Sequence, residues 1–93
     1  MHVLLVKLSL QIPYAQSLKD KRSQVKSLKD RLSNRLNASV AEIGALENRQ
    51  QAEMGVCMIG NDRSYLDKQY SLVEAVVLEY TDLQLTNITR EWL

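Results

Sequence analysis

The sequence predicts an α+β fold of the ferredoxin-like type, a βαββαβ sandwich in which two helices cover one face of a four-stranded antiparallel sheet. Three observations lead to this prediction. Four segments carry the apolar patterns of strands, two segments carry apolar residues at helical spacing, and they follow one another as strand, helix, strand, strand, helix, strand. With 93 residues in the chain, we expect one ferredoxin-like domain that spans residues 1–93.

The first strand and the first helix have the clearest patterns. From Leu4 to Ile12 every even position is apolar, which predicts a strand with one buried face. Pro13 ends this strand because proline has no N–H for a sheet. Ser17, followed by Asp20 three residues later, resembles a capping box and predicts that a helix begins there. Apolar residues then recur at helical spacing up to Leu36, which gives a helix of about five turns.

Two strands joined by a hairpin are predicted next. Ala38 to Gly44 has the pattern of a strand, and Ala52 to Gly60 is apolar on both faces, which is typical of a central strand. The connecting segment from Ala45 to Gln51 is short and polar, so it suits a hairpin better than a crossover helix.

The second helix and the last strand complete the order. Asn61 and Asp62 supply an N-cap, after which apolar residues step by three or four positions up to Tyr80. Leu83 to Trp92 is rich in β-branched and apolar residues and predicts the last strand.

One face of the predicted sheet has no helix to cover it. Val3 and Leu5, together with one side of the doubly apolar third strand, should point to this face. Contiguous apolar patches larger than a few hundred Å² usually mark interfaces. The sequence therefore predicts a homodimer.

Composition excludes several classes of protein. The single cysteine, Cys57, can form neither an intramolecular disulfide nor a multi-cysteine metal site, and it indicates a reducing, cytoplasmic location. No apolar run approaches the roughly 20 residues of a membrane span. Cys57 falls in a predicted buried strand and the only histidine, His2, lies at the N-terminus, so nothing indicates nucleophilic catalysis. We expect no enzymatic activity, no cofactor and no metal.

Positive charge is concentrated in the first predicted helix. The net charge of the chain is only +1, yet the segment from Ser17 to Asn37 carries seven basic and two acidic residues. At 100° per residue, Lys19, Arg22, Lys26 and Lys29 fall within about 80° of one another. These four residues are named the basic ridge here. Cations in the first turns of a helix oppose its dipole at a cost of roughly 0.3 to 1 kcal/mol, and like charges three or four residues apart cost a few tenths more. A bound anion would offset that cost.

Three interpretations of the basic ridge are open. It is a solvated face that aids solubility, a site for an anion or nucleic acid such as structured RNA or the ribosome, or a contact for an acidic protein partner. Lys21 differs from the ridge because its helical angle places it in the apolar stripe between Leu18 and Val25. Its side chain must snorkel to the edge of the core or pair with a carboxylate.

Two glutamates offer an alternative site. Glu42 and Glu53 lie on predicted adjacent strands, where a carboxylate pair could form the polar centre of a small-ligand, acid–base or magnesium site. They could equally be exposed strand residues or partners of the nearby Arg49.

Several motifs, taken together, resemble the YlxP-like family of small bacterial proteins over roughly residues 1–80. The motifs are Ile12-Pro13, Ser17-Leu18-Lys19-Asp20-Lys21-Arg22, Ser39-Val40-Ala41-Glu42 and Asn61-Asp62. The resemblance implies a ferredoxin-like fold, a cytoplasmic bacterial protein, and a gene often found among translation and ribosome-maturation genes, with no established activity. It places the family motif on Lys19, Lys21 and Arg22. We take these three residues, with Lys26 and Lys29, as the candidate anion or RNA site. The sequence departs from the family at Leu46-Glu47-Asn48-Arg49, where an Asp and a Trp are common.

Overall fold

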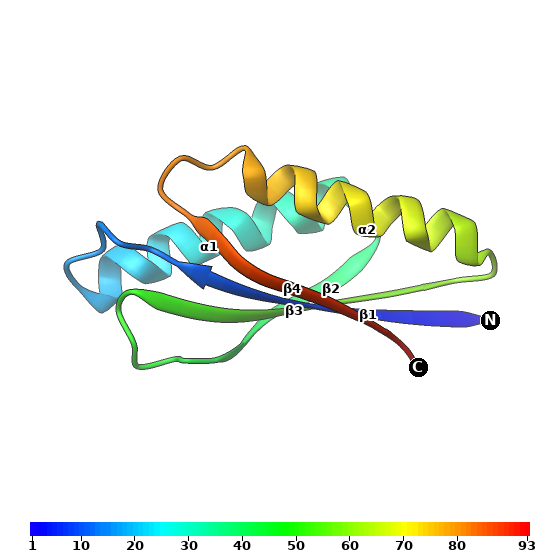
Figure 1. Ribbon diagram of the computed structural model, residues 1–93, viewed down its shortest axis with the longest axis horizontal. Helices are drawn as coiled ribbons and strands as arrows, with labels where there is room; N and C mark the ends of the chain where they lie inside the picture. The colour runs from blue at the N-terminus through cyan, green and yellow to red at the C-terminus, as the bar shows by residue number, and fades with distance from the viewer.

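The computed structural model describes residues 1–93 and confirms the predicted ferredoxin-like fold. The elements are β1 (His2–Gln11), α1 (Leu18–Arg35), β2 (Ala38–Gly44), β3 (Gln51–Gly60), α2 (Arg63–Leu78) and β4 (Gln84–Trp92). The strands form one antiparallel sheet in the order β2-β3-β1-β4. Both helices lie on the same face of this sheet, as Figure 1 shows. The predicted boundaries agree with the observed ones to within two residues at each end.

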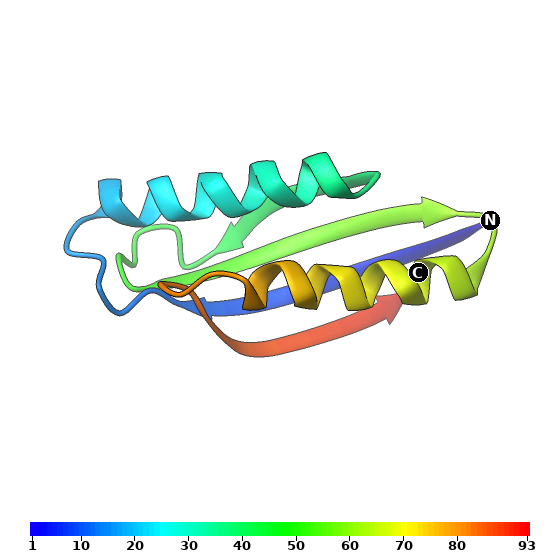
Figure 2. The ribbon, with the colours of Figure 1, turned by 90° about the horizontal axis from the view of Figure 1, so that it is seen from above.

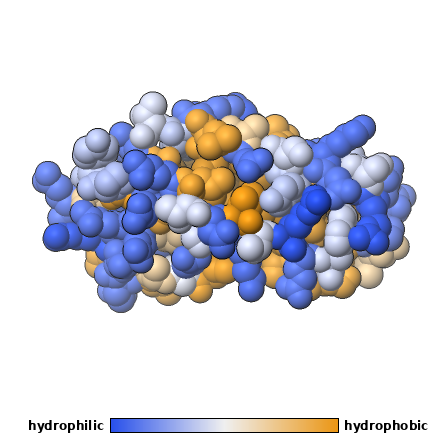
Figure 3. Space-filling model, in the orientation of Figure 1, coloured by the Kyte–Doolittle hydropathy of each residue, from blue (hydrophilic) through white to orange (hydrophobic).

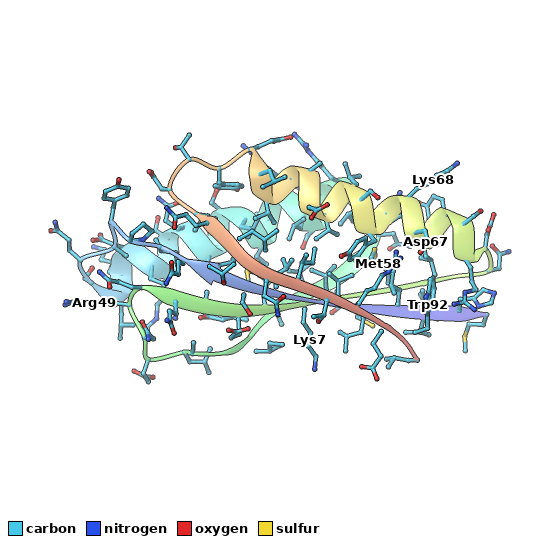
Figure 4. The ribbon with its side chains drawn as sticks, viewed as in Figure 1. Lys7, Arg49, Met58, Asp67, Lys68 and Trp92 are labelled. Atoms are coloured by element: carbon cyan, nitrogen blue, oxygen red, sulfur yellow. The ribbon has the colours of Figure 1, made fainter.

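The core lies between the sheet and the helical layer. The even-numbered residues of β1 from Leu4 to Leu10 are buried, which confirms the alternation predicted from the sequence. Leu28 and Leu32 of α1 and Val73 and Val77 of α2 are fully buried against them. Met58 of β3 points into the same layer (Figure 4). A single apolar cluster therefore joins the two helices to the sheet.

Side-chain caps start both helices, as predicted. The Ser17 hydroxyl accepts a hydrogen bond from the Asp20 N–H at 3.1 Å, and the Asp20 carboxylate accepts one from the Gln16 N–H at 3.1 Å. At α2, the Asp62 carboxylate accepts from the hydroxyl of Ser64 at 2.8 Å and from its N–H at 3.0 Å. These two hydrogen bonds, the hydroxyl first, hold the pKa of Asp62 below its ordinary value of 3.8.

The two helices cover different halves of the sheet. Seen from above in Figure 2, α1 lies over the side of β2 and α2 over the side of β1 and β4. The outermost strands, β2 and β4, each have one edge without a neighbouring strand. Neither helix has the length and apolar character needed to span a bilayer.

The hairpin between β2 and β3 has a local irregularity. The strands pair antiparallel, as predicted, but their register shifts by one residue between Glu42 and Gly44. Directly after this bulge Ala45 has a φ of 55°, a left-handed conformation that costs a non-glycine residue roughly 1–2 kcal/mol. The chain must therefore hold this turn in place by other contacts.

Candidate nucleic-acid interface

The basic ridge lies on the flank of α1 that faces away from α2. Lys19, Arg22, Lys26 and Lys29 are all exposed. The last three line a shallow groove of about 400 Å³ that α1 forms with the edge strand β2, where Glu42 also contributes to the lining. The structure thus gathers the four predicted ridge residues on one side of the molecule.

Three of the four ridge cations have no ion-pair partner within the chain. Lys26 contacts Asp30 at 2.7 Å, an exposed pair one helical turn apart. No carboxylate lies within ion-pair distance of Lys19, Arg22 or Lys29. Even after the Lys26 pair is discounted, the ridge keeps three charges that only solvent or an external anion can balance.

The remaining arginines of α1 serve another purpose. Arg31 and Arg35 both bind the carboxylate of Glu79, at 3.1 and 3.0 Å, just after the end of α2. The Arg31 guanidinium also lies 5.0 Å from the centre of the Tyr80 ring. These contacts connect α1 to the end of α2. Both flanks of α1 are therefore basic, but the arginines on the flank that faces α2 are paired within the chain, whereas most of the basic ridge is not. The i,i+4 spacing of Lys26 and Asp30 is a signal that is visible in the sequence, whereas no local pattern indicates Glu79, which is remote in the chain.

Lys21 is not part of this surface, and its assignment to the anion site is wrong. Its side chain is fully buried. The ammonium lies 2.9 Å from Oε2 of Glu42 and donates to the carbonyl oxygens of Ala45 at 2.6 Å and Leu46 at 3.5 Å. Of the two alternatives derived from the sequence, pairing with a carboxylate is confirmed and snorkelling is not.

This buried contact has two consequences for the groove. Lys21 neutralises Glu42, so the carboxylate beneath the ridge does not cancel the positive charge above it. Through its hydrogen bond to the Ala45 carbonyl oxygen, Lys21 also connects the left-handed turn to α1. The turn and the segment that follows, including Arg49, lie at the end of the molecule where α1 begins (Figure 4).

Glu42 and Glu53 do not form the polar centre considered from the sequence. Glu42 pairs in register with Met54, which is buried on the helical face, whereas Glu53 pairs with Ser9 on the opposite face. The Ser9 hydroxyl donates to Glu53 at 2.7 Å. The two carboxylates are separated by the sheet because neighbouring residues of a strand alternate between faces. Neither forms an ion pair or a hydrogen bond with Arg49, and no three His, Cys, Asp or Glu side chains cluster as a metal ion would need.

Comparison with known proteins places the chain in sequence space. A family model described as "Protein of unknown function (DUF503)" matches residues 3–90. A protein of Bacillus subtilis (strain 168), named "Uncharacterized protein YlxP", is 30% identical over 78 residues, which cover 84% of this chain and 85% of that protein. These matches confirm the resemblance seen in the motifs.

Solved structures support the fold alone. A de novo designed protein with a ferredoxin fold matches with a TM-score of 0.57 at 14% identity, over 100% of this chain and 84% of the design. LarC2, the C-terminal domain of a cyclometallase involved in synthesis of the NPN cofactor of lactate racemase, matches with a TM-score of 0.53 at 13% identity, over 100% of this chain and 55% of that one. At these identities no activity is transferred between proteins of one fold.

Proposed function

The chain belongs to the DUF503 family of proteins of unknown function, and we propose that it is a non-catalytic accessory protein whose basic ridge docks on structured RNA, such as ribosomal RNA, in the cytoplasm. The observation that carries the proposal is the set of unpaired cations on one flank of α1, at Lys19, Arg22 and Lys29.

The arrangement suits phosphates better than bases. The ridge residues are long and exposed, and they lie within a few turns along one helix, so successive phosphates of a nucleic-acid strand can approach them together. β3 has no aromatic side chain on which a base could stack, and the only aromatic ring of β1, that of His2 at its first residue, already packs edge-on against Trp92. Contacts of this kind give affinity and orientation but do not read sequence.

The test compares two double variants that remove the same charge from the same helix. Arg22→Gln/Lys29→Gln removes two unpaired ridge cations, whereas Arg31→Gln/Arg35→Gln removes two that Glu79 already holds. Binding to a fluorescently labelled RNA hairpin, and to purified bacterial ribosomes, is measured as a function of salt. The ridge variant should bind more weakly, and its slope of log affinity against log salt should be shallower by about 1.5–2 units.

The matched control decides the interpretation. Arg31→Gln/Arg35→Gln should change the salt slope by clearly less than the ridge variant does. Equal effects of the two variants would mean that only total charge matters, and absence of salt-dependent association by the wild type at low ionic strength would end the RNA proposal. Denaturant unfolding of each variant checks that the fold is retained.

An acidic protein partner is the second candidate. One observation favours it: the groove of the basic ridge adjoins the outer edge of β2, where backbone N–H and C=O groups lack a strand partner. An extended acidic segment could add to this edge while its carboxylates reach the ridge. The salt-dependent complex would then survive ribonuclease treatment, whereas an RNA complex would not.

A further inference from the structure

The face of the sheet opposite the helices carries a contiguous apolar surface. The register brings Val3 beside Ile59, and Leu5 beside Cys57, in adjacent strands. Ala41 lies beside Gly55, and Ile43 folds over that glycine, with its Cγ2 3.2 Å from the position a Cβ would occupy. This open-face patch consists of Val3, Leu5, Ala41, Ile43, Cys57 and Ile59. In Figure 3, orange residues also line the lower margin, where the open face begins.

We propose that the open-face patch is the interface of a homodimer in which two sheets pack face to face. Ile43 and Ile59 are 52% and 56% exposed in the single chain, although both are large and apolar. Burial of such side chains is favourable in proportion to the area removed from water. Two aligned sheets at about 10 Å separation would bury both copies of the patch.

The size of the face is adequate for a dimer. Four strands about 4.8 Å apart, each up to about ten residues long at about 3.3 Å per residue, present a face of about 600 Å². Two copies would bury about 1,200 Å², the lower limit of stable specific interfaces. A dimer of moderate affinity is therefore expected.

Charges on the same face favour a second copy as the occupant. Lys7 projects from the open face, away from the helices (Figure 4), and has no ion-pair partner in its own chain. Glu53 and Glu91 lie on the same face, because they pair with Ser9 and Leu5 of β1. Lys7 lies midway along β1, beside Gly55 and Thr89, and the two glutamates stand two residues to either side of it in the register. A rotated copy of this face can therefore bring each Lys7 opposite a carboxylate of the other chain.

The other route to a dimer is disfavoured by the basic ridge. Pairing of two β2 edges would place two copies of the groove side by side, so that Arg22, Lys26 and Lys29 of one chain would approach those of the other. Like charges at an interface are destabilising. Face-to-face packing instead leaves both ridges on the outer surfaces, and it requires no RNA, so its test is independent of the proposed function.

The experiment measures mass against concentration for the wild type and two variants. Wild-type protein should pass from 10.7 kDa toward twice that mass across the micromolar range in sedimentation equilibrium. Ile59→Glu should raise the dissociation constant by at least about tenfold, since it would bury a charge. Leu78→Glu is the matched control: Leu78 is 68% exposed but lies on α2, on the opposite side of the sheet, and this variant should dimerise like the wild type.

Cys57 supplies a readout that needs no substitution. It is the only thiol, and it is half-buried within the patch. Its rate of alkylation in the wild type should fall as the protein concentration rises, and in Ile59→Glu the rate should not depend on concentration. A wild-type mass of 10.7 kDa throughout the range would overturn the proposal. A dimer that leaves Cys57 equally reactive, or that Leu78→Glu weakens as much as Ile59→Glu, would overturn it as well.

Discussion

Lys21 is the only charged residue that the fold buries completely. Lys21 and its partner Glu42 differ in their access to solvent and in their other hydrogen-bond partners. Oε2 of Glu42 has no hydrogen-bond partner apart from this ammonium, but the glutamate side chain remains 18% exposed. The ammonium has two carbonyl oxygens as further partners but no access to water. The two residues should therefore respond differently to loss of the other.

We predict that Glu42→Met destabilises the protein more than Lys21→Met. The first variant leaves an unpaired buried ammonium, at a cost of about 3–5 kcal/mol. The second leaves a carboxylate that can turn toward solvent and a carbonyl without a donor, at about 1–3 kcal/mol. The double variant should be more stable than Glu42→Met alone, since it buries no charge. Urea unfolding measures all three, and equal losses in the two single variants would contradict the asymmetry.

For single residues, the sequence predicted where a side chain lies better than it predicted which residue that side chain contacts. The helical angle of Lys21 placed it in the apolar stripe, and the structure confirms that position. The choice of Glu42 as its partner depends on how α1 sits over β2, a non-local contact that periodicity does not encode. The supposed pairing of Glu42 with Glu53 failed because residue parity decides the face, and the bulge at Glu42 shifts the hairpin register.

Helices and strands were predictable because local signals agree with the tertiary contacts. Ser17 and Asp62 cap the two helices at the positions where the sequence carries a capping pattern. β1 alternates and β3 is apolar on both faces, as their burial requires. The ion pairs of Arg31 and Arg35 with Glu79, which connect α1 to the end of α2, were not predictable, because they join residues that are 48 and 44 positions apart.

The cap of α2 predicts a pH dependence. Hydrogen bonds from Ser64 favour the ionised Asp62, so its pKa is lower in the folded than in the unfolded chain. This contribution is fully present above 3.8, the ordinary pKa value, and disappears as pH falls through the lower folded value. Asp62→Asn keeps a capping oxygen but removes the titration. The melting temperature of the wild type should therefore exceed that of Asp62→Asn at neutral pH, and the difference should shrink in acid. A difference that is constant from neutral pH into acid would contradict this account.

The whole molecule separates its surfaces by chemistry. The helical layer seals one face of the sheet, the flank of α1 above β2 carries unpaired positive charge, and the other face carries the open-face patch. On the side formed by α2 and β4, apolar atoms gather in the middle and polar residues cover both ends (Figure 3). Val3 and Leu5, together with the doubly apolar pattern of β3, predicted an uncovered apolar face. The sequence could not show that the basic ridge borders the free edge of β2, because that depends on the strand order.

The strand order also predicts which strands are protected most from amide hydrogen exchange. β1 is hydrogen-bonded to β3 along its full length and to β4 along most of it, whereas β2 and β4 each have one neighbour. Amide hydrogen exchange should therefore be slowest in β1 and β3, and fastest at the outward-facing amides of β2 and β4. A face-to-face dimer covers side chains and adds no strand, so these outward amides should exchange equally fast at low and high protein concentration. Exchange followed residue by residue by NMR distinguishes the two modes of association. If protection of the outer amides of β2 increases with protein concentration, the chains pair through this edge, despite the charge of the basic ridge beside it.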